Sequence, residues 1–420
     1  MIKLPYDKTY LELPFSDGFS VLAPPSSSYQ SMGNQLEIVK AALTHPIASP
    51  CLADLAAGKK NVVIISSDHT RPVPSHITIP LIIEEIKRNN PQVKITVLIS
   101  TGMHRPTTPE ELQTKFGESV LEEVTVLNHQ SDKDEDMVFL GLLPSGGELW
   151  LNRLALEADL LIAEGFIEPH FFAGFSGGRK SVLPGIASQR TVLYNHNAKF
   201  IDSPYARTGI LDNNPINKDM VWAAERAGLG FILNVIINSQ KEIIYCVAGH
   251  PITAHHEGCE FVRNLTSVKA NLSDIVISTN GGYPLDQNVY QAVKAMTAAE
   301  AAAKPGAVII MVAGCREGLG GDNFYHQLAD VSSPKETMEM ILATPNKLTA
   351  PDQWQSQILA RVLMKHKVIM VTRPELASYI QNMHMDYAST INEALMKAVE
   401  LKGKDTPVTV IPDGVGIIVD

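Results

Sequence analysis

The stretch NVVIISSDHTRPVPSHITIPLIIEEIKR, residues 61–88, contains the pattern that decides the fold. Its first six residues, Asn61–Ser66, form an apolar β-branched run, which is typical of a strand buried on both faces. A polar loop with two prolines follows, and Ile79–Arg88 then has the pattern of a helix. Because such strands alternate with helices in parallel α/β sheets, this stretch is one strand–loop–helix unit of such a sheet.

The same pattern recurs along the rest of the chain. Helices are predicted over Pro109–Phe116, entered through the capping pair Thr107-Thr108, and over Asn288–Lys304. Phe231–Val247 has two apolar runs around Asn238-Ser239-Gln240, which indicates a β-hairpin. Six more strands are predicted at Lys94–Ser100, Asp159–Ala163, Asp274–Ser278, Ala307–Val312, Lys367–Thr372 and Val408–Ile411. The predicted fold class is α/β, with two domains built on mainly parallel sheets and an active-site cleft between them.

The length of 420 residues is too great for one compact core, so two domains are expected. A fresh series of strand, loop and helix opens at Asp274, which places the boundary at about residue 270. We therefore expect an N-terminal α/β cofactor-binding domain over 1–269 and a C-terminal α/β domain over 270–405 that closes on the substrate. Residues 406–420 are expected to return to the first domain.

Composition excludes several classes of protein. A net charge of −10 and a pI near 5.7 argue against nucleic-acid binding, which needs a positive surface. No apolar run approaches the length needed to cross a bilayer, so no membrane association is expected. The opening MIKLPYDKTY lacks the apolar segment of a signal peptide, which predicts a cytoplasmic protein. The four cysteines have no CxxC spacing and are read as reduced and mostly structural.

The residues able to carry chemistry follow the predicted strands, where open α/β sheets bind their ligands. The first such loop holds Asp68, Thr70 and Arg71, and Arg71 could grip a carboxylate or phosphate. The second holds His104, which could face a cleft as a general base. Taken singly, the simpler reading is favoured for both loops: an Asp–Arg pair that braces a turn and a histidine that braces a loop.

Two further loops bring more candidates. Residues 168–185, EPHFFAGFSGGRKSVLPG, contain His170 and Lys180, and His196 follows in LYNHN. After the strand at 274–278, a glycine-rich loop leads into a helix on which Tyr290, Gln291 and Lys294 share a stripe. A phenol, an amide and an ammonium could receive a carboxylate and a hydroxyl, although a solvated helix face is the simpler reading.

Standard cofactor motifs do not explain these loops. The stretch at 174–181 has Arg179 where a phosphate-binding loop needs its second glycine, and no strand runs into a GxGxxG motif. There is no HExxH motif, and His255-His256-Glu257 reads as a solvated helix surface. A metal site with few protein ligands would need a cofactor to supply the remaining ligands.

Together the loops resemble the nickel-pincer lactate racemase family. The matching segments are DHTRPVP, TGMHRP, EPHFFAGFSGGRKSVLPG, LYNHN and GGYPLDQNVYQAVKAMTAAEAA, with Trp354 in PDQWQ. They fall in the family's order and spread over both predicted domains. Several long and unusual motifs that agree together make this resemblance highly specific.

The resemblance implies a nickel-pincer nucleotide, a Ni(II) pyridinium-3,5-bisthiocarboxylate mononucleotide. Lys180 would attach it as a thioamide, and the glycines around Lys180 would let the backbone approach a flat ring. His196 would complete a near-square-planar nickel site, a geometry that suits Ni(II). The loop with Asp68, His69, Thr70 and Arg71 would contact the cofactor.

The resemblance also implies the roles of the remaining residues. His104 and His170 would each act as base for one enantiomer of a 2-hydroxy acid and as acid for the other. Carboxylate and hydroxyl contacts, and the walls of a small pocket, would come from Arg71, Lys294, Gln291, Tyr290 and Trp354. An electrophilic ring that takes hydride leaves a neutral ketone, whereas proton abstraction would add charge beside a carboxylate.

The expected activity is racemisation of a short 2-hydroxy acid, with lactate as the expected substrate, supported by partner enzymes that make the cofactor. A racemase or epimerase of malate, of a larger aliphatic or aromatic hydroxy acid or of a sugar acid is the alternative substrate reading. Two other classes stay open: a non-catalytic binder of a nucleotide or anionic metabolite, and a nicotinamide oxidoreductase. The oxidoreductase should release a keto acid, and the racemase should not.

Overall fold

The computed structural model describes residues 1–14, 18–25, 29 and 33–420. The chain divides into two compact units. The N-terminal unit consists of 28–195 and 204–264, and the C-terminal unit consists of 1–27, 196–203 and 265–420. The expected α/β class, with two parts built on mainly parallel sheets, is confirmed.

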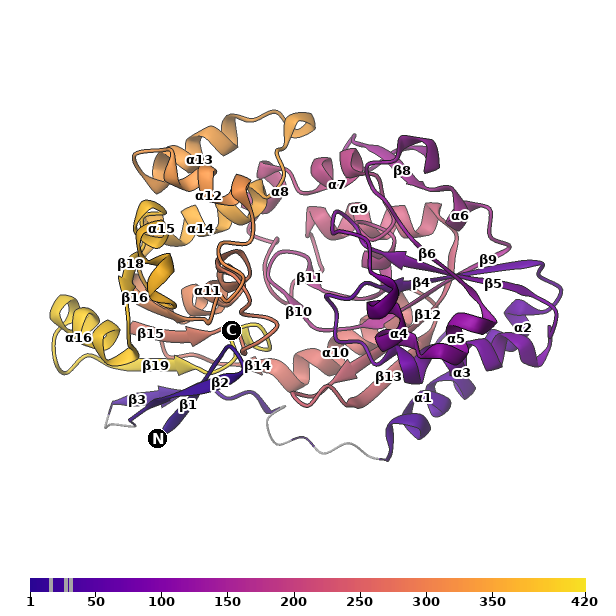
Figure 1. Cartoon of the computed structure of the whole chain (residues 1–420), viewed down its shortest axis with the longest axis horizontal. Coiled ribbons are helices and arrows are strands. Elements are labelled where there is room, and N and C mark those ends of the chain that lie inside the picture. The colour runs from indigo at the N-terminus through magenta and orange to yellow at the C-terminus, as the bar shows by residue number, and fades with distance from the viewer. Residues whose placement is uncertain (15–17, 26–28, 30–32) are drawn as a thin grey trace. The chain divides into compact units, whose positions relative to one another are not determined.

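The N-terminal unit is built on a six-stranded sheet with the order β13-β12-β9-β4-β5-β6 (Figure 1). Neighbouring strands are parallel, except that β12 and β13 form the predicted antiparallel hairpin. The central strands are apolar on both faces because helices cover both sides. The strands are β4 (Asn61–Ser67), β5 (Lys94–Ser100), β6 (Thr125–Asn128), β9 (Leu160–Phe166), β12 (Leu229–Ile237) and β13 (Ile243–Gly249).

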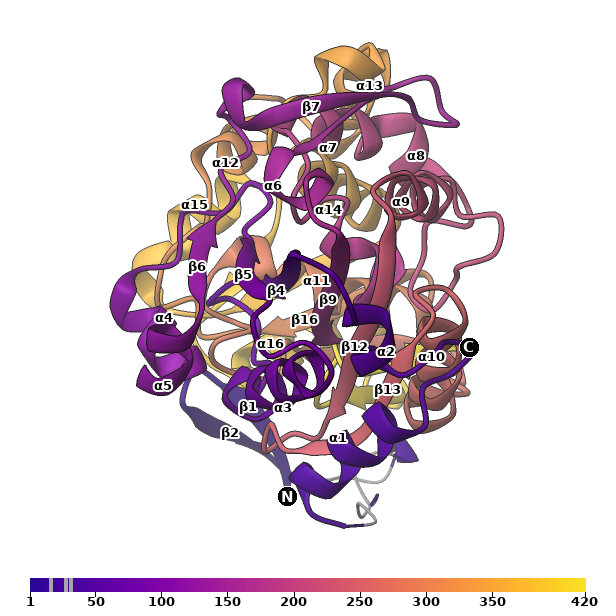
Figure 2. The ribbon, with the colours of Figure 1, turned by 90° about the vertical axis from the view of Figure 1, so that its right-hand side faces the viewer.

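Helices α1 to α5 pack on one face of this sheet around a single apolar core (Figure 2). The predicted cap of α4 is confirmed, because the Thr108 and Glu111 side chains form a capping box. The helices of the unit are α1 (Gln35–Thr44), α2 (Leu52–Ala56), α3 (Ser75–Arg88), α4 (Pro109–Phe116), α5 (Glu118–Glu123), α6 (Arg153–Leu156), α7 (Gln189–Asn195), α9 (Pro215–Arg226) and α10 (Thr253–Thr266). Shorter pieces are β7 (Met137–Leu142), β8 (Glu148–Asn152), β10 (Pro169–His170), β11 (Gly174–Phe175), η2 (Asp134–Asp136) and η3 (Gly178–Ser181).

The C-terminal unit is built on an all-parallel six-stranded sheet with the order β18-β17-β16-β15-β19-β3. Its strands are β3 (Phe19–Val21), β15 (Ser273–Thr279), β16 (Ala303–Val312), β17 (Lys367–Val371), β18 (Asp386–Ala388) and β19 (Val408–Ile411). Two small sheets pair β1 (Ile2–Tyr6) with β2 (Thr9–Leu13) and β14 (Ser267–Val268) with β20 (Ile418–Val419). Helices are α8 (Ala198–Asp202), α11 (Val289–Ala301), α12 (Asp322–Ala329), α13 (Pro334–Ala343), α14 (Gln353–Lys365), α15 (Ala377–Asn382), α16 (Ile391–Lys402), η4 (Asn346–Leu348) and η5 (Pro374–Leu376).

The chain termini correct one expectation about the domains. Residues 406–420 do not return to the N-terminal domain, because β19 pairs in parallel with β15 inside the C-terminal sheet. The first strands of the chain belong to the same unit, since β3 pairs with β19. Ser20 Oγ and Thr409 Oγ1 lie 3.1 Å apart across this pair. The C-terminal sheet is thus completed by both ends of the chain.

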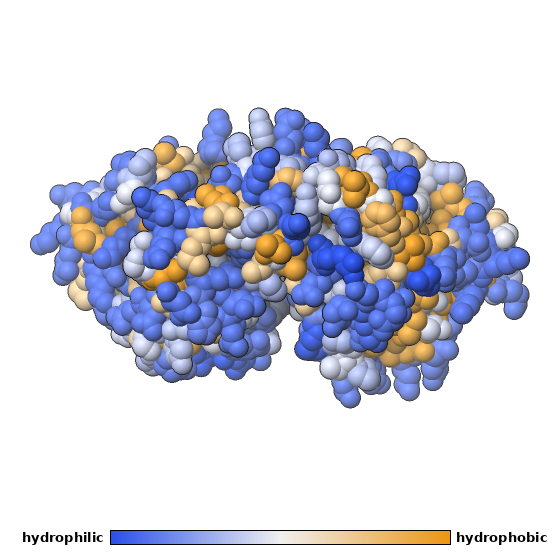
Figure 3. Space-filling view, turned by 90° about the horizontal axis from the view of Figure 1, so that it is seen from above, coloured by the Kyte–Doolittle hydropathy of each residue, from blue (hydrophilic) through white to orange (hydrophobic). Residues whose placement is uncertain are grey.

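The face drawn in Figure 3 is mostly polar, with groups of apolar residues between the polar ones. Within the described residues, no helix combines the length and apolar character needed to cross a bilayer.

Candidate active site

Three predicted loops leave one edge of the N-terminal sheet. Strands β9, β4 and β5 are adjacent and parallel, and Ser67 at the end of β4 pairs with Ser100 at the end of β5. The loops that follow carry Asp68, His104 and His170. The His104 loop is joined to the Lys180 turn, because the Gly102 N–H donates to the Gly185 carbonyl at 3.0 Å. The sheet therefore brings these candidates to one edge.

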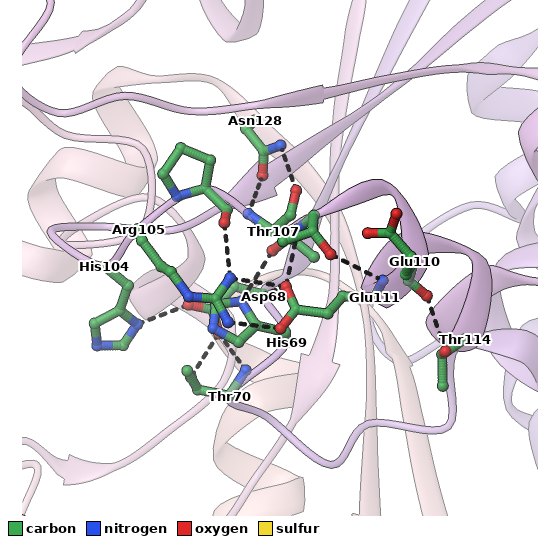
Figure 4. A network of polar contacts seen from close by, with 12 residues as sticks. Asp68, His69, Thr70, His104, Arg105, Thr107, Glu110, Glu111, Thr114 and Asn128 are labelled. Atoms are coloured by element: carbon green, nitrogen blue, oxygen red, sulfur yellow. Dashed lines mark hydrogen bonds and ion pairs between the residues drawn. The ribbon is translucent and has the colours of Figure 1, made fainter. Parts of the chain in front are cut away.

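His104 is held by a buried carboxylate (Figure 4). Its Nδ1 lies 2.6 Å from Asp68 Oδ2, so the ring donates its Nδ1–H and keeps the lone pair on Nε2. The His104 side chain is 47% exposed, whereas that of Asp68 is 3% exposed. This arrangement fixes the ring and leaves Nε2 available as a base.

Asp68 is ionised by its surroundings. Burial by itself raises the pKa of this carboxyl, but the hydrogen bond from His104 and the charge of Arg71 outweigh burial and lower the pKa well below its usual range. Thr70 donates to Oδ1 twice, from its N–H at 3.1 Å and its hydroxyl at 2.6 Å. Asp68 and Thr70 thus form a preorganised support for His104.

His69 turns away from this pair toward the start of α4 (Figure 4). Its Nδ1 lies 3.2 Å from Thr107 Oγ1 and 3.7 Å from Glu111 Oε2. Arg105 binds both oxygens of Glu111, at 2.8 and 2.6 Å, and this hydrogen bonding lowers the pKa of Glu111 to about 2. His69 therefore braces the loop, and its role in cofactor binding stays a prediction.

The Lys180 turn is shaped by packing within the protein. A Cβ on Gly178 would lie 2.8 Å from the ring of His255, and one on Gly177 would lie 2.8 Å from Asn234 Oδ1. Both glycines also have positive φ angles, 51° and 75°. The missing side chains of Gly177 and Gly178 therefore face the protein core, and the approach of the backbone to a flat ring stays a prediction.

Arg179 is the residue that organises this turn, and sequence reasoning gave it no role. Its side chain is 4% exposed. The guanidinium donates to the carbonyls of Ala173 and Phe175, both at 2.8 Å, and to Asn217 Oδ1 at 2.8 Å. Burial lowers its pKa to about 10, which still leaves it charged. The sequence feature that could have revealed this role is the position of Arg179 next to Lys180 in a glycine-rich loop.

His170 lies within this same loop and is held by backbone groups. The Ala173 N–H donates to Nδ1 at 3.2 Å. The His170 Nε2 lies 3.5 Å from Lys180 Nζ, and Nζ lies 5.7 Å from the centroid of the Phe172 ring. The structure therefore brings the predicted base His170 and the predicted anchor Lys180 together.

Glu164 is a second support that sequence reasoning missed. It is 1% exposed and accepts hydrogen bonds from three hydroxyls: Ser66 at 2.7 Å, Ser75 at 2.9 Å and Thr78 at 2.6 Å. It thereby ties the end of β4 to the start of α3 on both sides of the Asp68 loop. The sequence feature that could have revealed this role is an acidic residue inside the apolar strand LLIAEGF.

The C-terminal unit gathers three other predicted site residues. The Trp354 Nε1–H donates to Tyr290 Oη at 3.0 Å, and the His196 ring meets the Trp354 ring edge-on at 5.1 Å. His196 is 4% exposed. Burial, with the charge of Asp352, raises the pKa of Tyr290, so this phenol stays neutral. The three rings form one aromatic cluster.

Gln291 and Lys294 lie on α11, whose cap Asn288 accepts from the Gln291 N–H at 2.9 Å. Both side chains are half-buried, so the reading of a fully solvated helix face is wrong at these two positions. Their contact with a substrate stays a prediction.

The remaining titratable groups limit the possible metal chemistry. His255 is buried at 2% exposure and donates to the Ser176 carbonyl at 2.8 Å, so the reading of a solvated surface is wrong for this residue. Burial raises the pKa of Cys246 above its usual range and that of Cys259 and Cys315 to about 12. Across residues 1–14, 18–25, 29 and 33–420, no three His, Cys, Asp or Glu side chains lie close enough to hold a metal ion.

Comparison with known proteins identifies the family. The model of the lactate racemase N-terminal domain matches residues 6–209, and that of the lactate racemase C-terminal domain matches residues 268–419. The chain belongs to the lactate racemase family. Lactate racemases of Lactiplantibacillus plantarum and Thermoanaerobacterium thermosaccharolyticum are 53% and 52% identical to it, each over 100% of this chain and 99% of the relative. The chain is accordingly an isomerase, of the racemase type.

Solved structures agree with the fold. The lactate racemase apoprotein from Thermoanaerobacterium thermosaccharolyticum superposes with a TM-score of 0.96 at 51% identity, over 100% of this chain and 99% of that one. A protein from Thermotoga maritima superposes with a TM-score of 0.68 at 20% identity, over 93% of this chain and 100% of that one. The second likeness shows the fold alone.

Proposed function

We propose that this racemase interconverts D- and L-lactate with a nickel-pincer nucleotide attached through Lys180. The observation that carries the proposal is the 3.5 Å approach of Lys180 Nζ to His170 Nε2, at the sheet edge that also presents His104. A tethered group and two proton-transfer residues are the parts that such a reaction needs. The lactate racemases that are 52% and 53% identical over the whole chain support lactate over malate or larger acids.

The donor chemistry of the chain fits a cofactor that brings most of its own nickel ligands. Among the described residues, metal-binding side chains do not cluster in threes. The three buried cysteines have raised pKa values, so they are not available as thiolates. His196 would supply a single imidazole ligand to a nickel ion whose remaining ligands the cofactor would bring.

When bound, the cofactor supplies an electrophilic ring that accepts hydride from the alcohol carbon of the substrate. The protein handles the accompanying hydroxyl proton. His104 accepts it at Nε2, because its Nδ1–H is committed to Asp68. His170 would take the corresponding proton from the opposite enantiomer, and its imidazolium would return a proton to the product oxygen in the other direction. Exchange of these roles with the opposite enantiomer makes the reaction reversible.

The substrate contacts follow from the charges and sizes of the predicted residues. Arg71 and Lys294 would bind the carboxylate, and Gln291 would hydrogen-bond to the substrate. Tyr290 and Trp354 hydrogen-bond to each other, which gives a rigid aromatic wall suited to a methyl-sized side chain. Activity also depends on partner enzymes that make the cofactor, because a tethered mononucleotide must be built before it is attached.

The test is intact mass and nickel content of protein made in a host that produces the cofactor. Wild type should carry a nucleotide-sized mass adduct and about one nickel per chain, and it should racemise lactate without added NAD. Lys180→Met should lose all three properties. Lys218→Gln, at an exposed lysine on α9 of the same unit, should keep them. Active wild-type protein without an adduct or nickel would contradict the proposal.

A further inference from the structure

The loop that joins β15 to α11, residues 280–288, leads into the helix that carries the predicted substrate residues. We call it the β15 loop. Its aspartate, Asp286, is 1% exposed. The carboxylate oxygen Oδ2 accepts two backbone N–H groups from distant parts of the C-terminal unit, that of Asp7 at 2.7 Å and that of Gly314 at 2.8 Å. One buried side chain therefore joins three segments of this unit.

The first of the joined segments is the turn between β1 and β2, at Asp7. Besides the N–H that binds the buried carboxylate, the Asp7 carbonyl accepts the N–H of Tyr283, in the β15 loop, at 2.8 Å. The Asp7 carboxylate binds the Arg373 guanidinium at 2.9 Å. A Cβ on Gly314 would lie 2.7 Å from the Cβ of Asp7, so this turn packs tightly. The Asp7 turn is thus a fixed attachment point for the β15 loop.

The second joined segment is the loop after β16, residues 313–321, which we call the β16 loop. It binds the start of α11, because the Val289 N–H donates to the Gly318 carbonyl at 3.1 Å and the Tyr290 N–H donates to the Leu319 carbonyl at 3.0 Å. These amides belong to the first turn of the helix, where no carbonyl of the helix itself can reach them. The position of the β16 loop therefore sets the position of this first turn.

Asp286 holds the β16 loop through both its side chain and its main chain. In addition to the bond from Gly314, the Cys315 N–H donates to the Asp286 carbonyl at 2.9 Å. Cys315 has a φ of 44°, a left-handed conformation that persists in a residue other than glycine only where its surroundings hold it. In the part of the chain that the structure describes, the second carboxylate oxygen, Oδ1, is buried without a hydrogen-bond partner. What the side chain supplies is thus the acceptor at Oδ2.

We propose that Asp286 is a positioning residue for substrate binding. It holds the Asp7 turn and the β16 loop against the β15 loop, and it thereby fixes the first turn of α11. Tyr290 and Gln291 lie on that turn, and Lys294 lies about one helical turn further on. The link to substrate rests on the function proposed above, which assigns these three side chains to the substrate, whereas the holding of the two segments does not.

The kinetic test uses cofactor-loaded Asp286→Leu, which removes the acceptor and keeps a side chain of similar size. Its KM for both lactate enantiomers should rise at least about tenfold, and by a larger factor than kcat falls. The reason is that the proposed substrate contacts lie on α11, whereas His104 and His170 lie in the N-terminal unit. The mass adduct and the nickel content should equal those of wild type, because Lys180 also lies in the N-terminal unit.

The structural test is hydrogen–deuterium exchange of the full-length protein without cofactor. In Asp286→Leu the amides of Asp7 and Gly314 should exchange at least about tenfold faster than in wild type, because they lose their buried acceptor. Asp286→Asn can place its amide oxygen where Oδ2 lies, so it should keep wild-type exchange and a KM within about threefold of wild type. Asp405→Leu, at an exposed aspartate of the same unit, is the control and should match wild type.

Unfolding temperatures show whether each variant is folded, and Asp286→Ala, expected to act in the same direction, serves if Asp286→Leu is not. Wild-type exchange at both amides of a folded variant without the acceptor would overturn the proposal. Faster exchange with an unchanged KM would also overturn it, as would loss of the Lys180 adduct, which would indicate a defect of the whole protein. Cofactor-loaded wild type that does not racemise lactate would contradict the function proposed above, while exchange would still decide whether Asp286 holds the two segments.

Discussion

His104 and His170 follow two strands of one sheet, yet they are held in opposite ways. His104 donates from Nδ1 to the buried carboxylate of Asp68, so its Nε2 has a free lone pair. His170 accepts at Nδ1 from the Ala173 N–H. The two rings are thus oriented by different partners, one by a side chain and one by backbone amides. The mechanism proposed above uses both rings at every turnover, and the fold orients each of them before any substrate binds.

The two histidines differ because their loops differ. In TGMHRP, a short glycine turn leaves His104 exposed and dependent on a side chain from the neighbouring loop. In EPHFFAGFSGGRK, the chain folds back on itself as β10 and β11, and its own amides reach His170. A single substitution at Asp68 can thus release the ring of His104. Release of the His170 ring requires a substitution in the residues that hold its turn in place.

Removal of either ring should have the largest effect. We expect His104→Gln and His170→Gln each to lower kcat for both enantiomers by roughly 10² to 10⁴, because each enantiomer needs both rings in turn. Polarimetry of purified, cofactor-loaded enzyme measures this loss. His256→Gln, at an exposed histidine of the same unit, is the control and should keep wild-type kcat. A single variant that racemises one enantiomer at the wild-type rate would contradict the paired roles.

Arg179→Met should disrupt the turn whose backbone amides hold His170. It leaves the carbonyls of Ala173 and Phe175 and the amide of Asn217 without their buried donor. We expect a loss of about 3–5 kcal/mol in the free energy of unfolding, measured by urea denaturation, together with loss of the Lys180 adduct. Arg153→Met, at an exposed arginine on α6, should change neither quantity. A variant as stable as wild type would show that Arg179 does not hold this turn.

Asp68→Asn should weaken the support of His104, and its effect on kcat should be smaller. It preserves the shape but removes the charge that orients His104, so we expect kcat to fall about 10- to 100-fold while the Lys180 adduct remains. Asp132→Asn, at an exposed aspartate, should have no effect. Full activity of Asp68→Asn would show that the charge is not needed.

The same carboxyl predicts a pH dependence of stability. The pKa of folded Asp68 is below its unfolded value, so its contribution is present above pH 4 and is lost as the pH falls through the folded pKa. The difference between wild type and Asp68→Asn in the free energy of unfolding, about 1–3 kcal/mol near neutral pH, should therefore shrink in acid. A constant difference from pH 7 to pH 3 would contradict this contribution of the Asp68 carboxylate.

The sequence predicted the strands well, because runs such as Asn61–Ser66 are apolar on both faces and can only be buried. It also predicted which loops matter, since parallel strands bring the following loops to one edge. It did not predict that β3 and β19 complete the C-terminal sheet, because strand order depends on contacts between residues hundreds of positions apart.

At the site, the sequence likewise did not predict which individual side chains contact each other. The pairing of Asp68 with His104 joins two loops 36 residues apart and has no local signature. Gly177 and Gly178 were read as making room for a ligand, but the space that they leave is filled by Asn234 and His255. Composition cannot distinguish room for a ligand from room for a neighbouring side chain.

The transfer of hydrogen at the alcohol carbon tests the central claim most directly. Lactate deuterated at C2 would be racemised in ordinary water by cofactor-loaded enzyme, and the product enantiomer analysed by mass spectrometry. If hydrogen moves as hydride while His104 and His170 handle only the hydroxyl proton, the product should retain its deuterium at C2. Replacement of that deuterium by solvent hydrogen at each turnover would mean that an imidazole abstracts it as a proton, and would contradict the account.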